Sequence, residues 1–538
     1  MNKMVVLLTG LLIAISTLAT QMPDSSIEFL KTCAAGPECE IKLFYELSKT
    51  YRPSKEEDQL RDYIVKIKTV AETSIWNQNL ETFQDKIGNL MIRIPATGSF
   101  VGRNNAYFAL QSHMDMVLAY ADAKPGEDIR KYFAEGIKVE IKDGWLQSEG
   151  NKTTLGADNG TGVATGLRYL IDPKLSHPPM ELIFTVQEEI GLLGAFNSEL
   201  PLLSRKMLCL DGMTPEPGFI IAGAQGASAR VLTGLAKATD TDHAQDAVIE
   251  VTVSQLARGH SGGSIHLKRL NAMKAFGNLA KFVSSTVGPI QIKNLIVGDR
   301  VLNKIPNLFK AEMVIQQSSL TSDLSYQIET YLRKLIAENT DDNQNAKIEI
   351  KIQSAAGTRF LTTDFDFTKQ LIDSILQSPN GVIDSDSKYF NSVLTSSNLS
   401  FVELQPSADN SQINFQFGAM SRGFVDSRVN EIADQIQGLV SANKLSELKV
   451  EQKMLIPAWM EPESSVLLNK ILTDSGLFTK KFYLNGGLEP SAFKQKFLDL
   501  EVVALGPYTL NAHSVMEKVR LDTVQPTIDG IRKIIESQ

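Results

Sequence analysis

The sequence is 538 residues long, carries a formal net charge of −8 and contains three cysteines. That length exceeds what one ordinary hydrophobic core supports, so we expect two domains. The mildly acidic charge argues against nucleic acid or an anionic membrane surface as the main partner. A composition of 43% hydrophobic and 22% charged residues is that of a globular protein.

The first 20 residues have the pattern of an export signal. Lys3 supplies a positive charge, residues 4–15 form an apolar run too short for a stop-transfer helix, and small residues follow at 16–19. An uncleaved anchor or a buried helix is the alternative. We expect an exported chain, periplasmic or secreted, with no membrane attachment after signal cleavage.

Cysteine usage fits export. Cys33 and Cys39 flank a short Gly-Pro turn that can close a disulfide loop, which would stabilise the fold by roughly 2 kcal/mol. Two free thiols are the alternative. Cys209 lies in an apolar run and is expected to be a buried small hydrophobe.

The first predicted elements after the signal are two amphipathic helices, at residues 41–51 and 55–72. Ser54 is a plausible N-cap of the second helix, with Glu57 as its capping-box partner. Residues 82–87 and 90–94 then read as a hairpin around Gly88-Asn89.

Four apolar runs that follow predict buried strands, at 106–110, 180–186, 207–210 and 502–505. Helix-like stretches separate the first three, which indicates an α/β fold with a mixed, largely parallel sheet flanked by helices. Ligands bind beyond the carboxyl ends of strands in such sheets. Each run is followed by metal-type side chains; in chain order these are His113, Asp115, Glu188, Glu189, Asp211 and His513.

A glycine-rich turn at residues 153–160 places Asp158 ahead of a predicted helix at 163–171. Glycine lets a backbone turn sharply and approach a ligand closely. Asp-Asn-Gly is also an ordinary turn, so this motif depends on partners elsewhere in the chain.

Between residues 227 and about 453 the pattern of predicted elements changes from that of a parallel α/β layer to that of an α+β domain. Strands are expected at 248–253, 311–315 and 347–352, and helices at 267–283 and 324–337. The apolar run at 502–505 and His513 must return to the first sheet. We therefore predict a signal peptide (1–20), a catalytic domain in two parts (21–225 and 456–538) and an inserted α+β lid or dimerisation domain (226–455).

The collected imidazoles and carboxylates suit two zinc-like ions better than calcium or a thiolate zinc site. Two ions about 3.5 Å apart need a bridging ligand, and Asp158 is the natural one. Asp115, two residues after His113, can hold that imidazole's second nitrogen. Of the adjacent Glu188 and Glu189, one can ligate and the other can act as general base toward water held by the metals.

Each of these residues also has an ordinary explanation. Asp115 and Asp211 could cap helices, and paired glutamates usually open a solvated helix face. His177 and His243 are expected to be packed or solvated histidines. Four strand ends in one sheet, each followed by a metal-type residue, nevertheless favour the dinuclear site.

The motifs resemble a known family. Residues 110–117, 153–160, 187–195 and 511–514 are similar to the aminoacyl-histidine dipeptidases (peptidase D type, carnosinase-like) of the M20 zinc metallopeptidases. Residues 51–57 and 258–267 resemble that subfamily in particular. The similarity covers nearly the whole mature chain.

The resemblance implies a role for each residue. His113, Asp158 and Asp211 would hold one Zn2+, and Asp158, Glu189 and His513 the other, with Mn2+ or Co2+ as substitutes. Glu188 would be the general base. Asp115 would hold the imidazole of His113 in place without binding an ion itself. In the lid, His260 would stabilise the oxyanion and Arg422 would hold the substrate carboxylate; Glu489 would lie near the substrate amine. A homodimer through the inserted domain is also implied.

The expected activity is hydrolysis of dipeptides or short peptides from the free amino end, because Asp at the position of Asp211 accompanies that specificity in the group. Two departures bear on the substrate: Asn485-Gly486 stands where His-Ala is usual, and Val515-Met516 follows Ser514 where Pro-Asp is usual. The alternatives are an amidohydrolase acting on N-acyl amino acids and a peptide-binding protein without catalysis.

Overall fold

The computed structural model describes residues 23–538 except 37, 125, 213, 215, 340–344 and 443–445. The predicted export signal therefore lies outside the described residues. Among the described residues, no helix has the length and hydropathy needed to cross a membrane. The chain divides into two compact units: unit 1 comprises residues up to 224 with 459–483 and 488–538, and unit 2 comprises 225–458 with 484–487.

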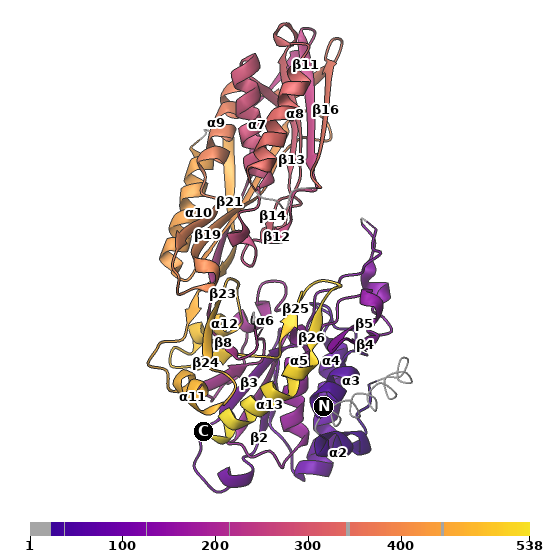
Figure 1. The fold of residues 1–538 in the computed structure, drawn as a ribbon, viewed down its shortest axis with the longest axis vertical. Helices are drawn as coiled ribbons and strands as arrows, with labels where there is room; N and C mark the ends of the chain where they lie inside the picture. Colours follow the sequence, from indigo (N-terminus) through magenta and orange to yellow (C-terminus); the bar gives the residue numbers. More distant parts are fainter. Residues whose placement is uncertain are drawn as a thin grey trace. The chain divides into compact units, whose positions relative to one another are not determined.

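Unit 1 is built on a mixed sheet in the order β1-β2-β6-β3-β7-β24-β8-β22, with β23 paired to β8 (Figure 1). The four central strands run parallel, and the edges are antiparallel. Their bounds are β1 Thr82–Gln84, β2 Leu90–Ile94, β3 Phe108–His113, β6 Met180–Thr185, β7 Lys206–Cys209, β8 Phe219–Ala224, β22 Trp459–Met460, β23 Lys480–Leu484 and β24 Glu501–Ala504. The predicted α/β class with a largely parallel sheet is confirmed.

Helices and a small second sheet complete unit 1. The helices are α2 Ile27–Ala35, α3 Cys39–Leu47, α4 Asp58–Ala71, α5 Ala157–Ile171, α6 Leu193–Phe196, α11 Val466–Asp474, α12 Pro490–Lys496 and α13 Leu521–Glu536. The small sheet has the order β25-β26-β5-β4, from β25 Thr509–Leu510, β26 Lys518–Arg520, β5 Trp145–Ser148 and β4 Val139–Lys142. Its β25–β26 hairpin carries His513 in the connecting loop.

The four predicted buried strands form because each contains a run of apolar residues, as parallel strands covered on both faces require. All six residues of β3 and all six of β6 are buried. Since the four central strands run in one direction, the residues that follow them meet at one edge of the sheet. This geometry brings together segments separated by more than 300 residues.

Unit 2 is an antiparallel sheet in the order β16-β11-β15-β13-β19-β20-β9-β21, with β18 paired to β19. Its strands are β9 Gly226–Ala236, β11 Asp246–Ser254, β13 Gln291–Val297, β15 Phe309–Gln316, β16 Lys347–Ser354, β18 Gly381–Ser385, β19 Val393–Pro406, β20 Ile413–Gly423 and β21 Ser446–Ile456. Two short pairs are added: β10 Ala238–Asp242 with β17 Arg359–Thr363, and β12 Gly259–His260 with β14 Lys304–Ile305.

One apolar core joins this sheet to four helices, α7 Ala272–Val287, α8 Leu324–Ala337, α9 Phe365–Gln377 and α10 Asp426–Ser441. Phe276 of α7 and Phe309 of β15 meet edge to face inside it. The edge strand β16 alternates charged and apolar residues, which keeps its outer face soluble. The predicted strands and helices of this region are all present.

Two local predictions have definite outcomes. Cys33 and Cys39 form a disulfide, and Cys209 is a buried free thiol, as expected. The capping box at Ser54 is wrong, because α4 begins at Asp58 and no side chain caps its first turn. Ser54 and Glu57 have other partners, which are described below.

Candidate metal centre

His113 is the last residue of β3 and is fully buried. Its Nε2 lies 3.0 Å from Oδ1 of Asp158 and 4.0 Å from Oδ2 of Asp211. Burial alone would lower the pKa of His113, but hydrogen bonds with Asp115 and Asp158 raise it well above the usual range. The imidazole therefore faces two carboxylates that converge on one ring nitrogen.

Asp158 stands at the start of α5, in the glycine-rich turn. Gly156 has φ +71°, and a Cβ there would lie 2.6 Å from Nη2 of Arg52 and 2.8 Å from Sδ of Met116. Only glycine satisfies both the left-handed backbone and this close approach. The peptide bond between Asp158 and Asn159 is cis.

The two oxygens of Asp158 face two different histidines. Oδ1 lies 3.0 Å from Nε2 of His113, and Oδ2 lies 3.0 Å from Nε2 of His513. The same nitrogen of His513 lies 2.8 Å from Oε2 of Glu189. One carboxylate is thus shared between two groups, which is the geometry of a bridging ligand.

Two groups of ligand-type atoms result, each within 4.8 Å: His113 with Asp158 and Asp211, and Asp158 with Glu189 and His513. A third group of the same size combines His113 with Glu188 and Glu189. Among the described residues, Oδ1 of Asp211 and Oε1 of Glu189 are buried without a hydrogen-bond partner. Such oxygens are costly unless something satisfies them, and a cation in each group would do so.

The electrostatics point the same way. Burial, and then the charge of Asp158, raise the pKa of Asp211 to about 8. The same two causes raise the pKa of Glu189. The site therefore holds more negative charge than its two imidazoles balance, and its nitrogen and oxygen donors fit two zinc-like divalent cations.

Glu188 belongs to the same centre but has a different environment. Its side chain makes no hydrogen bond or ion pair to another residue that the structure describes, although it lies within 4.8 Å of His113 and Glu189. Burial raises its pKa well above the usual range, and the charges of Glu189 and Asp211 add to this effect. A carboxylate with a raised pKa and no partner is suited to accept a proton.

Asp115 lies behind these groups and is fully buried. Its Oδ1 accepts the backbone N–H of Glu188 at 3.0 Å, and its Oδ2 accepts that of Glu189 at 3.2 Å. Oδ1 is also 3.5 Å from Nδ1 of His113, whose hydrogen bond goes to the backbone oxygen of Asp115 at 3.0 Å. Asp115 thus fixes both the imidazole and the glutamate pair.

Glu489 precedes α12 and is 1% exposed. Its Oε2 accepts hydrogen bonds from Nε2 of Gln111 and, at 2.7 Å, from Oγ1 of Thr185, while Oε1 has no partner among the described residues. Burial raises its pKa to about 7. Strands β3 and β6 therefore hold this acid through residues that lie two positions before His113 and three before Glu188 in the chain.

His260 and Arg422 lie together in unit 2. Nδ1 of the exposed His260 accepts the backbone N–H groups of Gly262 and Gly263, each at 3.2 Å, which places the proton of the neutral ring on Nε2. Arg422 of β20 is 5% exposed, and its Nε donates to Oγ of Ser261 at 3.3 Å. Burial lowers the pKa of Arg422 to about 10. A buried guanidinium with so few partners favours an anionic ligand.

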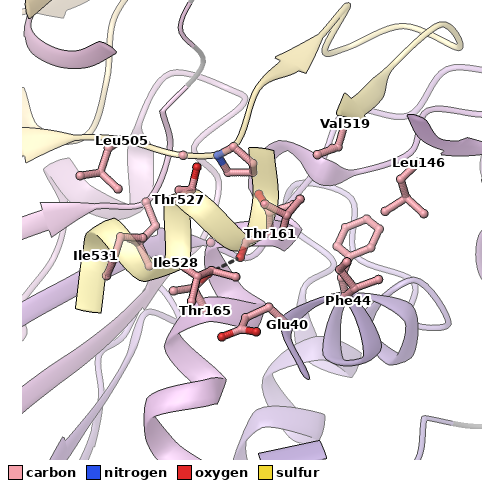
Figure 2. Close-up of a pocket in the computed structure, with 16 residues that line it drawn as sticks. Glu40, Phe44, Leu146, Thr161, Thr165, Leu505, Val519, Thr527, Ile528 and Ile531 are labelled. Carbon is pink, nitrogen blue, oxygen red and sulfur yellow. Dashed lines mark hydrogen bonds between the residues drawn. The ribbon is translucent and has the colours of Figure 1, made fainter. Parts of the chain in front are cut away.

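Unit 1 also contains an apolar pocket, which is lined in part by α5 and α13 (Figure 2). Thr161 and Thr165 of α5 line one side, and Ile528 and Ile531 of α13 line another. Leu210, which immediately precedes Asp211, is also part of the wall.

The comparisons with known proteins agree with this geometry. The cytosol non-specific dipeptidase of Escherichia coli is 27% identical over 489 residues, which is 90% of this chain and 94% of that protein. The predicted resemblance to the aminoacyl-histidine dipeptidases is confirmed. No protein-family model matches the chain.

Two solved structures show that the fold is shared. The aminoacylhistidine dipeptidase of Vibrio alginolyticus has a TM-score of 0.71 at 23% identity, over 94% of this chain and 98% of that one. The aminopeptidase PepT of Bacillus cereus has a TM-score of 0.55 at 17% identity, over 94% and 99%. The shared fold thus extends along almost all of the chain.

Sequence reasoning missed the residues that support the centre. Glu517 accepts hydrogen bonds from three backbone N–H groups of the Asp158 turn, and Arg52 binds three backbone carbonyls around it. Neither residue belongs to the groups of ligand-type atoms described above. The only available signals were the position of Glu517 four residues after His513 and the 51–57 motif.

Proposed function

We propose that the chain is an exported dinuclear zinc metallopeptidase that hydrolyses dipeptides or short peptides from the free amino end. The observation that carries this proposal is the sharing of Asp158 between two imidazoles, with the unpaired Glu188 beside them. Relatives named dipeptidases that match nearly the whole chain support peptide-bond hydrolysis as the reaction.

Five residues would hold the ions. His113 and Asp211 would complete one site with Asp158, and Glu189 and His513 the other. Two bound Zn2+ ions would polarise the scissile carbonyl and make water acidic enough to deprotonate near neutral pH. Mn2+ or Co2+ would substitute, because the donor set contains no thiolate.

Glu188 would move the proton. Its raised pKa lets it take a proton from the attacking water and return it to the leaving amine. Asp115 would keep Glu188 in place through the backbone bonds at 188 and 189. General acid–base catalysis of this kind contributes about 10²–10⁴-fold to the rate.

Three further residues would bind the substrate. The free oxygen of Glu489 would receive the amino group, and the guanidinium of Arg422 would bind the carboxylate of the peptide. His260 presents an Nε2–H that would stabilise the oxyanion.

Export rests on residues 1–20 and on the disulfide between Cys33 and Cys39, which belongs in an oxidising compartment. The Escherichia coli relative is named for the cytosol, so this chain would act in a different compartment. We further propose that two copies pair through unit 2, as the family resemblance implies.

A hydrolysis panel tests the proposal. Chelated protein is supplied with Zn2+, Mn2+ or Co2+ and assayed on dipeptides that include Xaa-His, on the same dipeptides with an acetylated amino end, and on N-acetyl amino acids. We expect metal-dependent cleavage of the free dipeptides alone. Cleavage restricted to N-acetyl amino acids would identify an amidohydrolase, and a metal-loaded protein inert on every peptide would indicate a binding protein.

A further inference from the structure

The segment at residues 52–57, between α3 and α4, directs its side chains into the metal centre. Oγ of Ser54 donates to Oδ2 of Asp115 at 2.7 Å. Oε1 of Glu57 accepts the backbone N–H of Gln187 at 3.0 Å, next to Glu188. A residue that was expected to cap a helix thus contacts the carboxylate that orients the glutamate pair.

Arg52 links two parts of the centre and is 1% exposed. Its Nη1 donates to the backbone oxygen of Met114 at 2.8 Å, and its Nη2 donates to that of Gly156. The end of β3, which carries His113, is therefore joined to the turn that carries Asp158. The backbone N–H of Met116 in turn donates to the oxygen of Arg52 at 3.1 Å.

Glu517 holds the same turn from the other side and is 1% exposed. Its carboxylate accepts the backbone N–H groups of Leu155 at 2.9 Å, Gly156 at 2.8 Å and Asp158 at 3.0 Å. Glu517 lies in the β25–β26 loop that also carries His513. The carboxylate of Glu517 thus connects the loop that carries His513 to the turn that carries Asp158.

We propose that Arg52, Ser54, Glu57 and Glu517 form a bracing set of positioning residues that sets the spacing of the metal ligands and of the general base. The inference rests on the proposed function but concerns residues outside its ligand and substrate sets. Glu517 and Arg52 act on Asp158, and therefore on the affinity for both ions. Ser54 and Glu57 act on Asp115 and Glu188, and therefore on kcat.

The chain supplies matched controls for a merely structural role. Glu181, near the start of β6, is fully buried and accepts the backbone N–H groups of Leu203 at 3.1 Å and Ser204 at 2.8 Å. Oγ of Ser204 donates to Glu181 at 2.6 Å, as Ser54 does to Asp115. The opposite end of β6 leads to Glu188, so both controls are remote from the metal ligands.

The first experiment compares Glu517→Gln with Glu181→Gln in the full chain. Urea unfolding of the metal-free proteins measures the structural cost, and competition with a chromogenic chelator measures Zn2+ affinity. We expect both variants to unfold at lower urea, and only Glu517→Gln to bind Zn2+ more weakly, by about 10–100-fold. Equal Zn2+ affinities in the two variants would overturn the role of Glu517.

The second experiment compares Ser54→Ala with Ser204→Ala and does not depend on whether Glu517→Gln folds. We expect Ser54→Ala to lower kcat about tenfold with KM unchanged, Ser54→Thr to restore it, and Ser204→Ala to match the wild type. An unchanged kcat in Ser54→Ala would overturn the bracing set. A wild type that neither binds Zn2+ nor cleaves peptides would instead refute the proposed function, and the bracing set with it.

Discussion

Nε2 of His513 lies 3.0 Å from Oδ2 of Asp158, although 355 residues separate the two in sequence. The contact exists because β24 runs parallel to β7 in the central sheet and the chain then enters the β25–β26 hairpin. All of unit 2 is inserted between the two halves of this site. The proposed catalytic site depends on this contact between His513 and Asp158, which the fold of the whole chain creates.

Glu188 is predicted to be needed for catalysis but not for metal binding. Glu188→Gln keeps the size of the side chain and removes its ability to accept a proton, so hydrolysis should fall by about 10²–10⁴-fold. Steady-state kinetics and metal analysis of the same sample check this. Full activity in the variant, or loss of the metal, would contradict the role as general base.

Arg422 is predicted to act on substrate binding. Arg422→Lys keeps a positive charge but loses the planar fork that pairs with a carboxylate. KM for a dipeptide should rise about 10–100-fold, while KM for the corresponding dipeptide amide, which lacks the carboxylate, should change little. Equal effects on both substrates would argue that Arg422 only supports unit 2.

His177 predicts a pH dependence of stability that is independent of the metal centre. It is fully buried between the rings of Trp76 and Tyr169, and burial lowers its pKa to about 4. The unfolded chain takes up this proton near pH 6.5, whereas the folded chain does so near pH 4. Stability is therefore fully present above pH 6.5 and is lost as the pH falls toward 4.

The corresponding variant is His177→Phe, which is aromatic and cannot titrate. Between pH 7.5 and 4.5 the free energy of unfolding of the wild type should fall by up to about 3 kcal/mol more than that of the variant. Urea unfolding at both pH values, with chelator present, measures the difference. Parallel losses in the two proteins would show that His177 does not contribute.

The disulfide between Cys33 and Cys39 gives a prediction about stability and compartment. Replacing both cysteines by serine should lower the free energy of unfolding by about 2 kcal/mol, because the closed loop is short. Intact mass with and without reductant, on protein purified from an oxidising compartment, checks that the bond forms. Two free thiols in that material would contradict it.

Much of the fold was predictable because its signals are local. The buried strands of unit 1 contain short apolar runs, and β16 in unit 2 shows clear alternation, so period and length identify both. The metal-type residues other than Asp158 could be identified because each follows such a run. The parallel order of the strands then brings them to one edge of the sheet.

The support of the centre could not be predicted, because backbone groups make it. Glu517 binds three amide N–H groups, and Arg52 binds carbonyls, so no side-chain pattern marks these contacts. Ser54 was misinterpreted for a related reason: Ser followed three residues later by Glu has the spacing of a capping box. In the structure both side chains serve tertiary contacts that only the folded chain creates.

The most direct test of the account is a metal count on Asp158→Asn. The amide keeps the shape of the side chain but cannot bridge two cations, so the wild type should hold about two ions per chain and the variant fewer than one. Inductively coupled plasma analysis after dialysis against a weak chelator gives both numbers. Retention of two ions by Asp158→Asn would contradict the shared carboxylate and the dinuclear mechanism built on it.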